Sequence, residues 1–292
     1  MAQPHLLALG FGFTATALAK SLLAQGWRVT GTTRSEDKRH SVTASGAEAV
    51  IWPGGDLAPA LATATHIVSS VPPRDEGDPA FELLADNIGA IPDLRWLGLL
   101  STTGVYGDHG GGWVDEDTPL VPSIHRSGLR ANQNAAWMEL WHRYGLPVHI
   151  FRLAGIYGPG RSALDKMRDG TARRIVKPDQ VFSRIHVEDI VQILEASFAR
   201  PTPGTAYNVA DDKPAPPQDV IEEAANLLGL PVPPDIPFED AKLRPMARSF
   251  YADNKRVRNS RIKQDLGVTL RYPDYHSGLR AILAAERGEN AP

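Results

Sequence analysis

The stretch His5-Leu6-Leu7-Ala8-Leu9-Gly10-Phe11-Gly12-Phe13-Thr14-Ala15 decides the fold of this 292-residue chain. Its apolar half predicts a buried strand, and its glycines predict a tight turn into a helix. Gly10 lets the chain leave the strand sharply, Gly12 leaves room for a pyrophosphate at the backbone amides, and small Ala15 lets the helix pack on the sheet. The pattern is typical of a dinucleotide-binding turn.

The residues after the turn support this interpretation. A helix is expected over 16–25, Gly26 ends it, and a second strand follows over 27–33. The N–H groups at the start of this helix, with Phe13 and Thr14 beside them, would bind phosphate oxygens. A purely structural strand-turn-helix unit is the alternative, because glycine-containing turns are common.

The end of the second strand indicates which dinucleotide is preferred. A carboxylate there would bond the ribose 2′-hydroxyl of NAD, whereas this chain has Thr33-Arg34-Ser35. A guanidinium can bind the 2′-phosphate of NADP or stack on adenine. We therefore expect NADP as the cofactor, with NAD possible; the alternative is a solvated basic loop that also includes Lys38 and Arg39.

The composition limits the class of protein. Hydrophobic residues make up 42% of the chain, charged residues 22%, and the net charge is −3, so nothing favours a nucleic-acid partner. Because the chain has no cysteine, disulfides, thiol catalysis and Cys-ligated metals are excluded, and no other metal-ligand cluster is expected. No apolar run reaches the ~18 residues of a membrane span, and no signal peptide is expected, so we predict a cytoplasmic location.

A loop is expected over 155–160 and a late helix over 254–267. Further strands are expected over 47–52, 66–71, 96–100 and 147–153, with helices between them, one of which covers 134–144. This alternation predicts an α/β fold, a Rossmann doubly wound parallel sheet with a smaller C-terminal substrate lobe. Asp56, after the third strand, would meet the adenine amino group or is an ordinary turn aspartate. Pro72 would form part of a stiff wall beside the cofactor. The expected domains are residues 1–160 with 184–210, and a substrate-binding lobe of 161–183 with 211–292.

The fifth strand leads into Ser101-Thr102-Thr103-Gly104-Val105-Tyr106-Gly107, which resembles a signature of the extended short-chain dehydrogenase/reductases, the NAD-dependent epimerase/dehydratase family. Other matching motifs follow in order, and the resemblance covers nearly the whole chain. These motifs are Asn87-Ile88-Gly89, Glu116 with Pro119 and Pro122, Arg152 to Gly160, Arg184 to Asp189, Tyr207 to Ala210 and Asp265-Leu266-Gly267.

The resemblance implies catalytic roles for several residues. Thr102 occupies the position of the hydroxyl that bonds the reacting oxygen of the substrate. The family's Tyr-x-x-x-Lys pair falls on Arg126 and Arg130, and neither residue matches. An arginine stays protonated, so Arg126 cannot remove a proton, whereas Arg130 could still bond ribose hydroxyls as the lysine would. The two arginines could instead hold an anionic group of the substrate, or be solvated.

Other departures shape the expected chemistry. Thr103-Gly104 stands where sugar-nucleotide dehydratases carry an acidic pair, which argues against that elimination. Tyr106 and Tyr157 could replace the missing acid/base, although both could instead serve in packing. His125 lies next to Arg126, which occupies the position of the family's tyrosine. His186 is interpreted as a structural histidine.

Two functions remain open from the sequence. The first is an NADP-dependent oxidoreductase or epimerase acting on a small sugar-like or anionic substrate. The segment from Arg161 to Lys177 is expected to be basic and irregular, and it could face such a substrate or be solvated. The second is a non-catalytic NAD(P)-binding sensor or interaction protein. The family resemblance also implies a possible homodimer.

Overall fold

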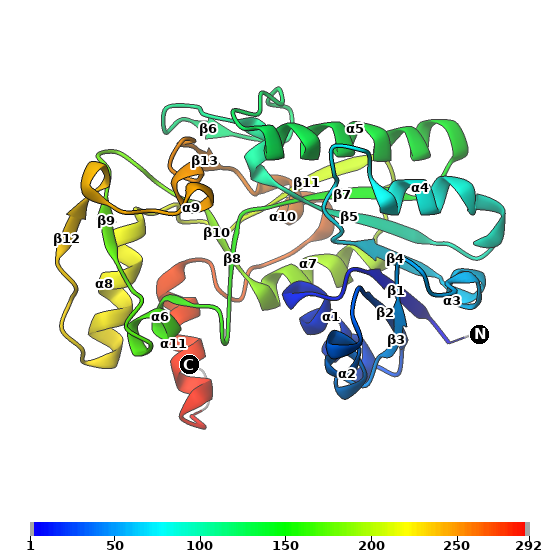
Figure 1. Cartoon of the computed structure of the whole chain (residues 1–292), viewed down its shortest axis with the longest axis horizontal. Helices are drawn as coiled ribbons and strands as arrows, with labels where there is room; N and C mark the ends of the chain where they lie inside the picture. The colour runs from blue at the N-terminus through cyan, green and yellow to red at the C-terminus, as the bar shows by residue number, and fades with distance from the viewer. Residues whose placement is uncertain (1–2, 290–292) are drawn as a thin grey trace. The chain divides into compact units, whose positions relative to one another are not determined.

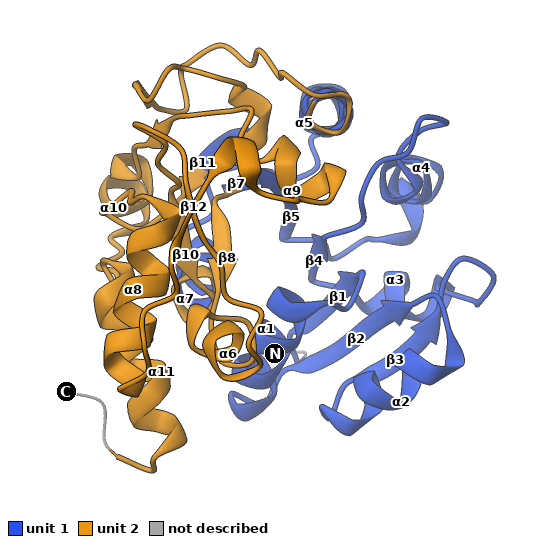
Figure 2. Cartoon of the chain, turned by 60° about the vertical axis from the view of Figure 1, so that its left-hand side comes forward, with its two compact units in different colours: residues 1–102, 128–152, 191–207 blue, residues 103–127, 153–190, 208–292 orange. Residues whose placement is uncertain are grey.

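The computed structural model describes residues 3–289, and its chain divides into two compact units (Figure 2). Unit 1 contains residues 1–102, 128–152 and 191–207, and unit 2 contains residues 103–127, 153–190 and 208–292. The expected lobes share most of their residues with these units. The residues of the expected dinucleotide domain that group with unit 2 instead are 103–127, 153–160, 184–190 and 208–210. The outer ends of the expected domains, 1–2 and 290–292, lie outside the described residues.

A seven-stranded sheet carries unit 1, with strand order β11-β7-β5-β4-β1-β2-β3. Leu7 of β1 lies opposite Thr30 of β2 and Ile67 of β4, and both pairings are parallel. The strand order reverses between β1 and β4, which is where doubly wound sheets bind ligands. The expected Rossmann fold is therefore confirmed. The strands are β1 (His5–Leu9), β2 (Arg28–Thr33), β3 (Glu48–Ile51), β4 (His66–Ser69), β5 (Trp96–Thr102), β7 (Val148–Leu153) and β11 (Thr205–Val209).

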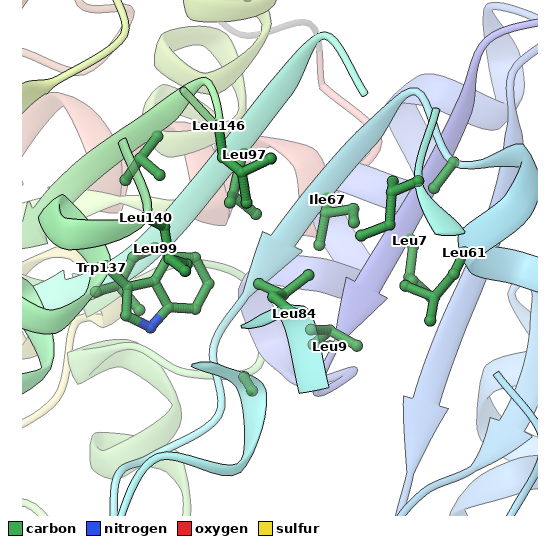
Figure 3. Packing of buried hydrophobic residues seen from close by; sticks show 14 of the residues in the cluster. Leu7, Leu9, Leu61, Ile67, Leu84, Leu97, Leu99, Trp137, Leu140 and Leu146 are labelled. Atoms are coloured by element: carbon green, nitrogen blue, oxygen red, sulfur yellow. The ribbon is translucent and has the colours of Figure 1, made fainter. Parts of the chain in front are cut away.

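One face of this sheet is covered by α3 (Ala58–Thr63), α4 (Pro79–Asp86) and α5 (His125–Tyr144). Figure 3 shows Leu84 of α4 and Trp137 of α5 packed with leucines of the strands. Trp137 is completely buried. Burial of a large aromatic side chain removes 150–250 Å² from water, roughly, so this contact is a main anchor of α5.

The other face is covered by α1 (Phe13–Ala24) and α7 (Val187–Ala199), which lie across the sheet from α4 and α5 in Figure 1. The Trp96 indole of β5 lies edge-on to Phe198 and donates to the Ser197 hydroxyl at 2.9 Å. Ser21 of α1 bonds Glu195 of α7 at 2.6 Å. The central strands are thus buried on both faces, as a parallel sheet requires. Helix α2 (Glu36–Ala44) follows β2.

Unit 2 is built from short strands and helices around its own apolar cluster, which includes Leu164, Ala224 and Leu279. Three two-stranded parallel sheets pair β10 with β8, β12 with β9, and β13 with β6. The strands are β6 (Trp113–Val114), β8 (Gly155–Tyr157), β9 (Arg174–Val176), β10 (Arg184–His186), β12 (Asp235–Pro237) and β13 (Arg256–Val257). The helices are α6 (Ala163–Arg168), α8 (Pro217–Leu228), α9 (Pro245–Ser249), α10 (Ser260–Leu266) and α11 (Tyr275–Glu286).

Three expected elements differ from the structure. The helix expected over 134–144 begins nine residues earlier, because α5 starts at His125. The helix expected from Asn254 begins only at Ser260, since Arg256 and Val257 pair with β6 as a strand. Gly155–Tyr157 was expected as a loop but forms β8. Among the described residues no helix is long and apolar enough to cross a membrane.

Candidate functional site

The glycine turn after β1 is held against its neighbouring strands. Gly10 has a φ of 83°, in the left-handed region, and a Cβ there would lie 2.8 Å from the Ser70 hydroxyl. The Gly10 N–H donates to the Thr32 hydroxyl at 2.8 Å, and the Phe11 N–H donates to the Thr32 carbonyl at 3.0 Å. Glycine is therefore required at position 10, and the turn is fixed to β2.

Phe11 fills the space above a glycine of β2. A Cβ added to Gly31 would lie 2.2 Å from the Phe11 ring. The large residue in the turn and the missing side chain in the strand thus complement each other. This contact fixes the direction in which the turn leaves the sheet.

The N-terminus of α1 begins at Gly12, which is exposed and has no atom within 4 Å of the position of a Cβ. As the N-cap residue, Gly12 makes no side-chain cap hydrogen bond. Thr14 and Ala15 are buried beneath it, and Phe13 is half-buried. An uncapped helix start with open space above it is suited to an anion, because its N–H groups and the helix dipole attract negative charge.

The end of β2 carries an exposed cation. Thr33 is buried, Arg34 is exposed, and Ser35 precedes α2 without a side-chain cap bond. Within residues 3–289 Arg34 has no ion-pair partner, whereas the nearby Arg39 pairs with Glu36 at 3.3 Å. Arg34 is thus an exposed cation at the end of β2.

Two further candidates for the cofactor site, Asp56 and Pro72, are exposed residues of unit 1. One carboxylate oxygen of Asp56 accepts the Ala58 N–H at 2.9 Å, in the manner of a turn aspartate, and the side chain is exposed. Pro72 is exposed beyond the carboxyl end of β4. Both lie at the sheet edge where the glycine turn also stands.

Arg130 of α5 reaches this same edge of the sheet. Its Nη1 donates to the Val71 carbonyl at 3.3 Å and to the Leu100 carbonyl at 3.4 Å. Thr102, half-buried, is the last residue of β5. Unit 1 therefore brings the glycine turn, Arg34, Thr102 and Arg130 to the carboxyl edge of one sheet.

Unit 2 contains the other catalytic candidates, and their surroundings differ from those of an exposed acid/base. Tyr106, in a 3₁₀ turn (Thr103–Tyr106), is completely buried and its phenol donates to Asn208 at 2.7 Å. Tyr157 is buried, and this burial, with Asp211 nearby, raises its pKa. These contacts agree with the packing alternative for both tyrosines.

Arg126 begins the first turn of α5 with His125, and both side chains are exposed. The Arg126 guanidinium lies 6.0 Å from the centre of the Phe250 ring. This is within the range of a cation–π contact. Arg126 and Arg130 are four residues apart on one helix, so they share a face.

His186 and most of the basic segment have structural partners. His186 is buried, which lowers its pKa to about 4, and its Nδ1 accepts the Glu188 N–H at 3.2 Å. Arg168 pairs with Glu286, and Arg174 pairs with Asp235 at 2.7 Å. The segment expected as irregular contains α6 and β9.

A pocket of about 470 Å³ lies within unit 2. Lys177 and Arg256 supply its positive charge. Gln180, 1% exposed, donates its amide to the Asp253 carbonyl at 2.8 Å, and its Oε1 has no hydrogen-bond partner within the described chain. The pocket thus combines two cations with one acidic residue, Asp179. Its lining consists of Gly110, Gly111, residues 176–181, Pro216, Gln218 and Arg256.

Sequence reasoning missed several of these polar residues. Gln180 and Arg256 reach one pocket from segments that are far apart in the chain, so no local motif joins them. Asp78 and Gln133 are buried and hydrogen-bonded to each other. The only local signal for Asp78 was its place before Pro79, typical of a helix start. Between residues 3 and 289 no group of three or more His, Asp or Glu side chains could hold a metal ion.

The fold and the glycine turn define a Rossmann-like α/β protein whose fold is shared by solved structures of the epimerase/dehydratase type. No family model matches the chain. Protein YeeZ of Escherichia coli is 30% identical over 284 residues, covering 91% of this chain and 95% of that protein. The chain belongs to the family of Protein YeeZ. A 3-diazoavenalumate denitrifying reductase of Streptomyces is 30% identical over 182 residues, 57% of this chain and 58% of the reductase.

Solved structures share the fold of this chain. A functionally unknown conserved protein from Silicibacter pomeroyi DSS is 54% identical, with a TM-score of 0.91 over 97% of this chain and 99% of that one. An NAD-dependent epimerase/dehydratase homologue from Methylobacillus flagellatus is 26% identical, with a TM-score of 0.68 over 98% and 100%. The dTDP-glucose 4,6-dehydratase of Bacillus anthracis, in complex with NAD, is 18% identical, with a TM-score of 0.75 over 99% and 98%.

Proposed function

We propose that this protein is an NADP-preferring oxidoreductase that works without a tyrosine acid/base. The observation that carries the proposal is the open, uncapped start of α1 behind Gly12, at the sheet edge that also carries Arg34 and Arg130. The fit is favourable because a pyrophosphate needs the space that a side chain at Gly12 would take. A solved neighbour that contains NAD adds support. Bound NADPH would supply a hydride.

The preference for NADP rests on Arg34. Its guanidinium is exposed and unpaired within residues 3–289, and no carboxylate stands in the Thr33-Arg34-Ser35 segment to bond a 2′-hydroxyl. An arginine binds a phosphate through two parallel N–H bonds. The 2′-phosphate would therefore meet Arg34 while the pyrophosphate occupies the α1 terminus.

Replacing Arg34 with alanine is expected to weaken NADPH binding about tenfold, equivalent to ~1.4 kcal/mol, and to leave NADH binding nearly unchanged. The lost contact is one that only NADPH makes. Titration calorimetry with both coenzymes measures the ratio. Lys38→Ala, on the exposed face of α2, is the matched control, and equal losses for NADPH and NADH on changing Arg34 would contradict the phosphate contact.

The chemistry is limited by the residue in the tyrosine position. Arg126 is permanently protonated, and Tyr106 and Tyr157 are buried and hydrogen-bonded. A substrate suited to such a site accepts a hydride without needing a proton from a phenol. The similar denitrifying reductase is named for a diazo substrate. In the reduction of an aryl diazonium, the hydride and its electron pair form a C–H bond at the ring carbon. The C–N bond breaks and its bonding electron pair leaves with N₂, so no proton is required.

The pocket of unit 2 supports an anionic or sugar-like substrate. Lys177 and Arg256 would attract a phosphate or carboxylate of the ligand, and Asp179 in the same lining would accept a hydroxyl. The proposal therefore combines an electrophilic carbon with an anionic group in one small molecule.

Changing Arg126 to tyrosine tests the catalytic part of the proposal. We expect at least about tenfold faster NADPH-dependent reduction of aldehydes and ketones, because a phenol can give the alkoxide its proton. Reduction of an anionic aryl diazonium is expected to stay within about twofold, since the reaction uses no proton. Steady-state NADPH oxidation measures both rates, and Arg126→Lys, which keeps the cation, is the control.

Arg126 also favours a second candidate, a sensor that binds NADPH without turnover. The two functions differ in one result. If NADPH binds but is oxidised by no member of a panel of diazonium compounds, aldehydes, ketones and sugars, the oxidoreductase proposal is wrong and the sensor is favoured.

A further inference from the structure

The guanidinium of Arg130 is held by a side chain as well as by two carbonyls. Gln133 Oε1 accepts from Arg130 Nη1 at 2.8 Å, shorter than the contacts to Val71 and Leu100. An arginine has a long, flexible side chain, and ordering it costs rotamer entropy when nothing fixes it. Gln133 therefore supplies the shortest of these three contacts and the one made by a side chain.

Gln133 is itself fixed, because both hydrogens of its amide are used. Its Nε2 donates to Asp78 Oδ2 at 2.7 Å and to the Val71 carbonyl at 3.3 Å, and the residue is 2% exposed. A carboxylate accepts hydrogen bonds and donates none, so Asp78 determines which end of the amide faces it. The Oε1 end must then face Arg130.

Asp78 is well placed for this role. One of its oxygens accepts the Ala80 N–H at 3.0 Å and so caps α4, while the other also accepts the Trp137 indole N–H at 2.7 Å. The side chain is 8% exposed. The carboxylate is thus held by the start of α4 and by α5, and its position does not depend on any ligand.

We propose that Asp78, acting through Gln133, is a positioning residue that holds Arg130 ready for the nicotinamide-side ribose. The inference rests on the proposed function and on the role that the family resemblance implies for Arg130, in place of the ribose-binding lysine. An ammonium presents its three donors symmetrically, whereas a planar guanidinium must be turned correctly to bond two adjacent hydroxyls. The Asp78–Gln133 pair provides that orientation.

Asp78→Asn is the sharpest test. The amide oxygen can still cap α4, but the Nδ2 group then faces two donors, so the Gln133 amide turns over and presents N–H groups to Arg130. We expect the Kd of NADPH to rise about tenfold, the loss of one charge-assisted hydrogen bond. The Kd of adenosine 2′,5′-bisphosphate, which has no nicotinamide ribose, is expected to stay unchanged. Asp86→Asn, exposed at the end of α4, is the matched control.

Gln133→Met provides a second variant that leaves the Asp78 cap in place. It should weaken NADPH binding and leave binding of the bisphosphate unchanged, as Asp78→Asn does. In a protein that already carries Arg130→Ala, neither variant should weaken NADPH binding further. Equal losses for NADPH and the bisphosphate would mean a general structural role and would overturn the inference. If Arg130→Ala binds NADPH normally, Arg130 does not contact the ribose and the inference is wrong, whereas the pyrophosphate site at the start of α1 is unaffected by this result. If the unaltered protein binds neither compound, the proposed function itself fails.

Discussion

Changing Gly12 to glutamate is expected to abolish NADPH binding without lowering the melting temperature. The backbone at Gly12 has a φ of −107°, which any residue adopts, and no atom lies within 4 Å of the position of a Cβ. The folded protein therefore accepts the side chain. The carboxylate would occupy the space proposed for the pyrophosphate and repel it, and like charges in contact cost several kcal/mol, or about 100-fold or more in Kd.

The control for this variant is Gly89→Glu. Gly89 is also exposed, has no atom near the position of its Cβ and belongs to a short 3₁₀ helix (Ile88–Ala90). Calorimetry gives the Kd of NADPH, and thermal melting gives the stability. If Gly12→Glu still bound NADPH within a few-fold of the unaltered protein, the α1 terminus would not be the pyrophosphate site.

Truncation of Trp137 to alanine is expected to lower the free energy of unfolding by about 3–5 kcal/mol. The side chain is completely buried between α4, α5 and the sheet, as Figure 3 shows, so its removal leaves a large cavity. It also deprives the buried Asp78 carboxylate of an N–H donor. Urea unfolding followed by circular dichroism measures the loss.

Trp137→Phe separates the two contributions. It keeps most of the apolar contact and removes only the indole N–H, so a loss of about 1–3 kcal/mol is expected. An alanine variant no less stable than the phenylalanine variant would show that packing on this face contributes little, contrary to the core described above.

The parallel sheet was predictable because its evidence is local and redundant. The strand His5–Leu9 is apolar throughout, its glycine turn has one usual context, and strands alternate with helices after it. The start of α5 was missed for a physical reason. Gly128 lowers helix propensity, and the buried positions Ser127, Gln133 and Asn134 are polar, so the apolar periodicity is weak there. Tertiary hydrogen bonds supply what the sequence pattern lacks.

The candidate site likewise contains residues that a local motif predicts and residues that only long-range contacts bring together. Gly10, Gly12 and Arg34 were identified from the sequence because they belong to one strand-turn-helix-strand unit. Asp78 and Gln133 could not be, since their roles depend on a contact across 55 residues. Arg256 was expected in a helix, and only its pairing with β6 reveals it as part of a strand beside a pocket.

The contact between Phe11 and Gly31 has a consequence for how this turn can vary among homologues. The ring occupies the volume that a side chain on β2 would need, so the two positions share one fixed space. Residue 31 can gain a side chain only where residue 11 becomes small. Homologues that differ here should therefore show the exchange at both sites together, and a pattern built only on the turn glycines would overlook this coupling.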